Sequence, residues 1–149
     1  MGVPSFCGTH PLTLGRLNHV GVATPSIERS VAMWRDMLGA TRLGEPFDLP
    51  AQGVRVCFVD APNSQIELIE PLGEDSPLHG FLARNPAGGQ HHVCFEVADV
   101  PAAAAEMAAK GARILGPPRI GAHGVPVIFL HPKDMGGVLI ELMEAPGGH

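Results

Sequence analysis

The segment NHVGVATPSIERSVAMWRDMLGA, residues 18–40, returns in altered form as HHVCFEVADVPAAAAEMAAKGA, residues 91–112, when one single-residue gap is allowed. In each copy, alternating apolar residues predict a short strand, and apolar residues three or four apart then predict a helix. Self-similarity at this scale indicates that the chain is two copies of one structural unit. The rest of the sequence is interpreted from this repeat.

In the first copy, Val20 and Val22 alternate along the strand, Thr24 and Pro25 begin the helix, and Gly39 ends it. The predicted apolar stripe of this helix consists of Ile27, Val31, Trp34 and Leu38.

The second copy repeats the plan. Asp99 and Pro101 mark the start of its helix, and Gly111 closes it. The alternating strand residues are Val93, Phe95 and Val97, and the helix stripe is Val100, Ala104 and Met107.

Extended stretches follow each helix, bounded by Pro, Gly, Asn and Asp. They are Val54–Val59 and Gln65–Ile69 in the first half, and Val125–Leu130 and Val138–Met143 in the second. Thr41–Phe47 and Arg113–Leu115 could each supply one further strand. Each unit is therefore predicted as β-α-β-β-β, which makes the fold class α+β.

The predicted organisation is a single domain over residues 1–149, with modules at about 15–70 and 90–145 and a connector at 71–89. In the connector, Ser76 and Pro77 predict the start of a short helix.

Composition narrows the class of partner. Apolar residues make up 45% of the 149 residues, charged residues 17%, and the net charge is −5, which argues against a disordered chain and against nucleic-acid binding. We therefore expect a small-molecule partner. Cys7, Cys57 and Cys94 have no disulfide or metal-site spacing, and no apolar run is long enough for a signal peptide or a membrane span. A cytoplasmic protein with reduced thiols is expected.

Each copy places a histidine on its first strand and a glutamate on its last. His19 precedes Glu67 by 48 residues, and His92 precedes Glu141 by 49. Because strand side chains alternate, all four are predicted on the face opposite the helix-packed apolar residues. Two imidazoles and two carboxylates suit one divalent ion, Co²⁺, Mn²⁺, Ni²⁺, Fe²⁺ or Zn²⁺. A coincidence of position in both copies favours a shared metal site over four unrelated polar residues.

Other polar residues have simpler interpretations. His91 is predicted as a structural, hydrogen-bonded residue on the opposite face from His92. For His123 and His131, loop structure and the mouth of the metal site both stay open. Lys133 is either exposed or a receiver for an anionic substrate group.

Three stretches carry a resemblance to a known family: LNHVGVATP from Leu17, residues 71–97, and IGAHGVPVIFLHPKDMGGVLIEL from Ile120. Over about residues 17–144 the chain resembles the vicinal oxygen chelate superfamily of glyoxalases, bleomycin-resistance proteins and dioxygenases. Within it, the chain is most similar to the methylmalonyl-CoA epimerases. The first stretch is common to the superfamily, whereas the other two are typical of the epimerases.

The resemblance implies two tandem βαβββ modules that form an open, cup-shaped mixed sheet around one metal ion, commonly Co²⁺, in a homodimer. It implies an acyl-CoA substrate, (2R)- or (2S)-methylmalonyl-CoA, epimerised by C2 proton abstraction through a metal-chelated enolate, with no nucleic-acid or membrane partner. His19, Glu67, His92 and Glu141 match the metal-ligand positions, and Glu141 also matches a proposed acid/base residue.

One departure affects the predicted catalytic groups. Some family members carry a second catalytic carboxylate just after a Gln-Gly turn, but here Gln52-Gly53 is followed by Val54, Arg55 and Val56. Our hypothesis is that Glu67 and Glu141 supply the two bases. Three alternatives stay open: a glyoxalase I-type lactoylglutathione lyase, an extradiol dioxygenase and a metal-free small-molecule-binding resistance protein. Glu67 and the absence of tyrosine disfavour the extradiol dioxygenase.

Overall fold

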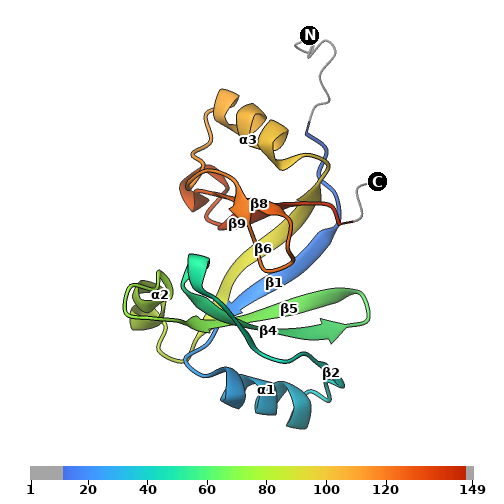
Figure 1. Cartoon of the computed structure of the whole chain (residues 1–149), viewed down its shortest axis with the longest axis vertical. Helices are drawn as coiled ribbons and strands as arrows, with labels where there is room; N and C mark the ends of the chain where they lie inside the picture. The colour runs from blue at the N-terminus through green and yellow to red at the C-terminus, as the bar shows by residue number, and fades with distance from the viewer. Residues whose placement is uncertain (1–11, 147–149) are drawn as a thin grey trace. The chain divides into compact units, whose positions relative to one another are not determined.

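The computed structural model describes residues 12–146, and it divides into two compact units. The central unit is Leu17–Cys94, and the terminal unit is Phe95–His149 with Met1–Arg16, taken here only over the described residues. Figure 1 shows the helices and strands of both units. Strand β6 runs through both, because the division falls between Cys94 and Phe95.

The central unit has the predicted β-α-β-β-β order, except that two short strands, Arg42–Leu43 and Phe47–Leu49, replace the single strand expected over Thr41–Phe47. Its elements are β1 (Leu17–Ala23), α1 (Ile27–Asp36), β2 (Arg42–Leu43), β3 (Phe47–Leu49), η1 (Pro50–Gln52), β4 (Val54–Ala61), β5 (Ser64–Pro71), α2 (Leu78–Arg84) and the start of β6 (Gly89–Val97). The strands follow one another across the sheet as β2-β4-β5-β1-β6, with β3 paired to β4. β1 and β5 are parallel, whereas β4 and β5 are antiparallel, so the sheet is mixed.

The terminal unit repeats the plan. After the end of β6 come α3 (Val100–Ala109), β7 (Arg119–Ile120), β8 (Pro126–Leu130), η2 (Pro132–Asp134) and β9 (Ile140–Glu144). The strand order is β6-β9-β8-β7, and β8 pairs antiparallel with both β7 and β9. The α+β class with two βαβββ units and mixed strand pairing is confirmed.

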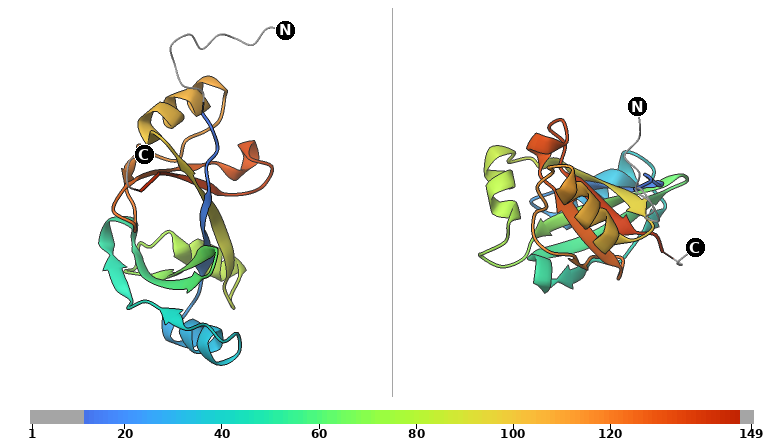
Figure 2. Two further views of the ribbon diagram at one scale, coloured as in Figure 1. Left: turned by 90° about the vertical axis from the view of Figure 1, so that its right-hand side faces the viewer. Right: turned by 90° about the horizontal axis from the view of Figure 1, so that it is seen from above.

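Each unit buries the apolar stripe of its own helix. α1 packs on β4 and β5 of the central unit, and α3 packs on β8 and β9 of the terminal unit (Figures 1 and 2). The central core is Ile27, Cys57, Val59 and Leu68, with Val22, Val31, Trp34 and Ile66 packed against it. The terminal core is Val97, Val100, Ala103, Ile128, Leu130 and Leu142, with Phe95, Ala104, Met107 and Ile140 packed against it.

The two helices begin in the same way. Ser26 caps α1 and Asp99 caps α3, each side chain accepting a hydrogen bond from a backbone N–H three residues later. In addition, Glu70 Oε1 accepts from Ile27 N at 2.7 Å. Glu144 Oε1 accepts from Val100 N at 3.0 Å, so in both units a carboxylate from the last strand closes the helix start.

Two details of the prediction were wrong or incomplete. The predicted apolar stripe of α1 includes Leu38, but the helix ends at Asp36 and Leu38 is 61% exposed, because Gly39 at φ +73° turns the chain away. Arg113–Leu115 forms no named strand and contributes only the bridge Ile114–Leu130. Gly116 at φ +93° and the two prolines after it interrupt any longer ladder.

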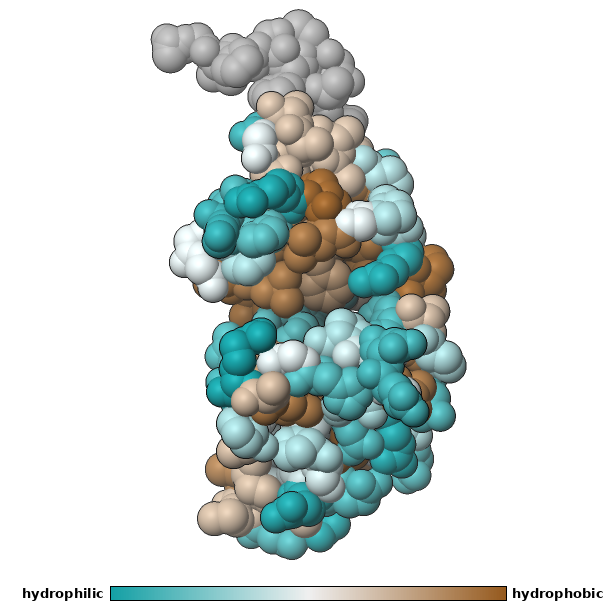
Figure 3. All heavy atoms as spheres, turned by 90° about the vertical axis from the view of Figure 1, so that its left-hand side faces the viewer, coloured by the Kyte–Doolittle hydropathy of each residue, from teal (hydrophilic) through white to brown (hydrophobic). Residues whose placement is uncertain are grey.

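The surface carries apolar residues among hydrophilic ones, as the brown and teal groups of Figure 3 show on one face. Met33, Met37 and Leu38 are exposed near the end of α1. Within residues 12–146, none of the helices combines the length and the apolar character needed to cross a membrane. Cys57 and Cys94 are buried, and burial raises the pKa of the Cys57 thiol. Cys7 lies outside the described residues.

Candidate metal centre

Three adjacent strands of the central unit place His19, Glu67 and His92. His19 lies on β1, Glu67 on β5 and His92 on β6, in the strand order β5-β1-β6. The parallel pairing of β1 with β5 sets Gly21 opposite Glu67. Because Gly21 and His19 are two residues apart on one strand, they share a face, and Glu67 joins that face.

The predicted faces are confirmed for these residues. Val22, Ile66 and Leu68 pack on the central core beneath α1, and His19 and Glu67 alternate with them along their strands. His19 is 0% exposed, His92 3% and Glu67 6%. Buried imidazole and carboxylate groups are stable only when they are paired or bound to an ion. These three side chains must therefore pair with one another or bind a common ion.

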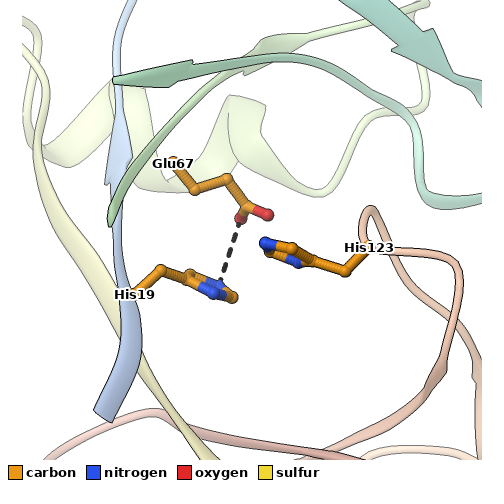
Figure 4. A group of neighbouring side chains, drawn as sticks. All are labelled: His19, Glu67 and His123. Carbon is orange, nitrogen blue, oxygen red and sulfur yellow. Dashed lines mark ion pairs between the residues drawn. The ribbon is translucent and has the colours of Figure 1, made fainter. Parts of the chain in front are cut away.

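The three side chains converge through their ligand atoms (Figure 4 draws His19 and Glu67, with their ion pair dashed). His19 Nε2 and His92 Nε2 lie 3.3 Å apart. Glu67 Oε1 lies 3.7 Å from His19 Nε2 and 3.3 Å from His92 Nε2. The two imidazole rings meet edge to face at an interplanar angle of 87°.

This triangle of atoms has the size of a metal site. A circle through three points with these separations has a radius of about 2.0 Å, and imidazole nitrogens and carboxylate oxygens bind divalent ions such as Zn²⁺ at about 2.0–2.2 Å. The spacing of the three atoms therefore suits a single divalent ion, which His19, Glu67 and His92 would hold. Two histidines and one carboxylate are also a common donor set for divalent transition metals. The residues of the central unit fit such an ion.

Glu141, the fourth predicted residue, lies in the terminal unit on β9. It is 6% exposed and pairs with Phe129 of β8. Its neighbours Ile140 and Leu142 pack on the terminal core beneath α3, so Glu141 lies on the other face of β9, as predicted.

Of the residues with open interpretations, His131 has a structural role: its Nδ1 accepts a hydrogen bond from Lys133 N at 3.1 Å at the start of η2. Lys133 is exposed, and His123 is half-buried in the loop between β7 and β8. Sequence reasoning assigned no site role to Asn18 or Gly21, although both flank His19. Asn18 Oδ1 lies 2.7 Å from His19 Nδ1, and Gly21 lies against the His92 ring.

Comparison with known proteins agrees with this fold. The family model of the Glyoxalase/Bleomycin resistance protein/Dioxygenase superfamily matches residues 18–129, and the chain belongs to this superfamily. It is 55% identical over 133 residues to the ethylmalonyl-CoA/methylmalonyl-CoA epimerase of Cereibacter sphaeroides, covering 88% of this chain and 98% of that protein. Within the superfamily, the chain belongs to the methylmalonyl-CoA epimerase family.

Two further relatives support this membership. The mitochondrial methylmalonyl-CoA epimerase of Bos taurus is 54% identical over 143 residues, covering 95% of this chain and 81% of that protein. A solved methylmalonyl-CoA epimerase in complex with methylmalonyl-CoA and ammonium matches with a TM-score of 0.82 and 36% identity, covering 92% of this chain and 99% of that one. All three relatives are epimerases, which favours this class over the glyoxalase I, dioxygenase and resistance-protein alternatives.

Proposed function

We propose that this chain epimerises methylmalonyl-CoA, interconverting the (2R) and (2S) forms by removing and returning the proton at C2. The observation that carries the proposal is the convergence of His19, Glu67 and His92 at 3.3–3.7 Å in a chain of the epimerase family. The substrate is an acyl-CoA, as in the complex of the solved relative with methylmalonyl-CoA.

The proposed cofactor is one divalent ion per chain, held by His19, Glu67 and His92 of the central unit and by Glu141 of the terminal unit. Co²⁺ is the first choice, and Mn²⁺, Ni²⁺ and Zn²⁺ are the alternatives. When bound, such an ion supplies Lewis acidity toward the substrate oxygens, which makes the C2–H bond more acidic. The inclusion of Glu141 rests on the repeat, in which it corresponds to Glu67.

Glu67 and Glu141 are the proposed acid/base pair. Inversion at C2 requires a proton to leave from one face and to arrive at the other, so two proton-carrying groups serve the reaction better than one. When the C2–H bond breaks, its electron pair moves into the thioester carbonyl and the proton passes to a carboxylate oxygen. Glu67 is buried, so its carboxylate can hold that proton away from bulk water.

The proposed range of acyl groups extends beyond methylmalonyl. The Cereibacter sphaeroides relative is an ethylmalonyl-CoA/methylmalonyl-CoA epimerase, and it is 55% identical to this chain. Ethylmalonyl-CoA, which carries one more methylene on C2, is therefore the second substrate to test.

The homodimer and the cytoplasmic location implied by the sequence are part of the proposal. The free, buried thiol of Cys57 is consistent with a reducing compartment. Light scattering of the purified chain measures the oligomeric state, and a mass of one chain would contradict the dimer.

The deciding experiment is proton NMR of methylmalonyl-CoA in D₂O with the metal-loaded protein. We expect the C2 proton signal to disappear as deuterium replaces it, and (2R) substrate to become a mixture of both epimers. Protein stripped by a chelator is the control and should exchange slowly until Co²⁺ is restored. Absence of C2 exchange with loaded protein would reject the proposed activity.

A further inference from the structure

We propose that Asn18 and His91, the residues directly before the two ligand histidines, are positioning residues that hold both imidazoles in the Nδ1–H tautomer. In that tautomer each Nε2 keeps its lone pair for a metal ion. The inference rests on the metal site of the proposed function and assigns it an outer layer of residues.

The first contact joins Asn18 and His19. His19 Nδ1 and Asn18 Oδ1 lie 2.7 Å apart. An amide oxygen only accepts, so His19 Nδ1 must carry the proton and donate it. In the neutral ring the other nitrogen is then unprotonated, and this nitrogen, Nε2, lies 3.7 Å from Glu67 Oε1.

The second contact joins His91 and His92. Their Nδ1 atoms lie 2.9 Å apart, a distance that requires one ring to donate and the other to accept. His92 Nε2 is the nitrogen that lies 3.3 Å from Glu67 Oε1 and from His19 Nε2. With Nε2 as the metal ligand, His92 donates from Nδ1 and His91 accepts.

His91 is itself held in place. Its ring meets the ring of Phe81 edge to face, with centroids 5.2 Å apart and an interplanar angle of 73°. Phe81 lies on α2, the helix of the connector between the two repeated segments. The connector therefore fixes His91, and His91 in turn orients the imidazole of His92.

The arrangement explains how two Nε2 atoms are held 3.3 Å apart. With both Nδ1 atoms protonated, each Nε2 keeps a lone pair that a divalent ion would use when bound. Fixing both tautomers before binding lowers the cost of assembling the site, as outer hydrogen-bond partners of metal-bound histidines commonly do. The repeat supplies the same device twice, because both acceptors occupy the position before the ligand.

The test is ¹⁵N NMR of histidine-labelled protein at about pH 8, above the ordinary histidine pKa, first metal-free and then with Zn²⁺. Long-range ¹H–¹⁵N spectra distinguish the two tautomers of each ring. We expect His19 and His92 to be Nδ1–H in both states, and the signal of each Nε2 to shift when Zn²⁺ is added.

Four variants test whether the hydrogen-bond acceptor, and not the shape of the side chain, sets the tautomer. Asn18→Leu removes the acceptor and Asn18→Asp keeps it, while His91→Phe keeps a ring against Phe81 and His91→Gln restores an oxygen acceptor. We expect Asn18→Leu and His91→Phe to lose the Nδ1–H tautomer at their own histidine only and to bind Zn²⁺ about 10–100-fold more weakly. Asn18→Asp and His91→Gln should keep the Nδ1–H tautomer and most of the Zn²⁺ affinity. Gln90→Ala, an exposed change on β6, is the control.

Two results would overturn the proposal: Nδ1–H tautomers that persist in folded Asn18→Leu and His91→Phe, or a Zn²⁺ affinity equal to that of the wild type in both. Failure of the proposed function has a different signature. If the tautomers and Zn²⁺ affinity respond as expected but no C2 exchange occurs, the epimerase activity is rejected while the role of Asn18 and His91 stands.

Discussion

Gly21 of β1 leaves the space that the imidazole of His92 occupies. A Cβ added at position 21 would overlap the ring atoms Cε1 and Nδ1 of His92, although the two residues are 71 positions apart in the sequence. The backbone of Gly21 needs no left-handed conformation, so its role is to allow this close approach. The histidine of one repeat thus lies over the strand that carries the histidine of the other.

Gly21→Ala should therefore displace the His92 ring. We expect divalent-metal affinity to fall about 10–100-fold, the range seen when a ligand loses its orientation, with a lower unfolding temperature. Isothermal titration with Zn²⁺ and thermal unfolding measure the two effects. Gly80→Ala is the matched control, because a Cβ there meets only the flexible end of Arg84 and should leave affinity unchanged. Equal affinities in wild type and Gly21→Ala would contradict the steric argument.

Glu67→Gln tests whether the carboxylate is a base or only a ligand. The amide keeps the shape of the side chain and cannot take a proton, so we expect C2 exchange and epimerisation to slow about 10²–10⁴-fold. Metal content measured on the same samples separates loss of the ion from loss of the base. The exposed Glu45→Gln serves as the control. If exchange and epimerisation both persist at wild-type rates, Glu67 is only structural.

Glu144→Ala should lower stability without affecting the metal site. Glu144 Oε1 accepts the hydrogen bond of Val100 N at the start of α3, and removing a charged acceptor from a partly buried donor costs about 1–3 kcal/mol. Urea unfolding measures the change, and Zn²⁺ titration should give the wild-type affinity. The exposed Glu74→Ala is the comparison, and an equally small effect in both would refute the role of Glu144.

The pair Arg113–Asp134 should make the stability of the terminal unit sensitive to acid. The side-chain hydrogen bonds from Arg113 lower the pKa of Asp134 from 3.8 to about 2. Because the pKa of Asp134 is lower in the folded state, the pair contributes fully to the free energy of unfolding above the unfolded pKa of 3.8. This contribution is lost as the pH falls toward about 2.

Asp134→Asn removes this titration. We expect the wild type to lose more thermal stability than the variant between about pH 5 and pH 2.5, measured by circular dichroism. Asp75→Asn, an exposed substitution, should behave as the wild type. Parallel stability curves for wild type and Asp134→Asn over this interval would show that the pair contributes nothing.

Local sequence patterns predicted the two units and the faces of their strands. Alternation along β1, β5 and β9 predicted that His19, Glu67 and Glu141 lie opposite the helix-packed residues, and each does so within its own unit. The start of the second helix at Asp99 also followed from local pattern, whereas the first helix begins at Ile27 after its cap Ser26, two residues later than Thr24 and Pro25 predicted. These features are predictable because side-chain alternation and helix capping depend on residues only a few positions apart.

The way in which those faces meet depends on strand pairing over long sequence distances. The parallel register that sets Gly21 opposite Glu67, the strand order β5-β1-β6, and the 3.3 Å between His19 Nε2 and His92 Nε2 appear in no local pattern. The same holds for the hydrogen bond that makes His91 a partner of His92. Strand register depends on pairing between distant segments, and a shift of one residue in a strand would turn its candidate residue to the other face. Sequence periodicity therefore gives the candidates, and strand pairing brings them together.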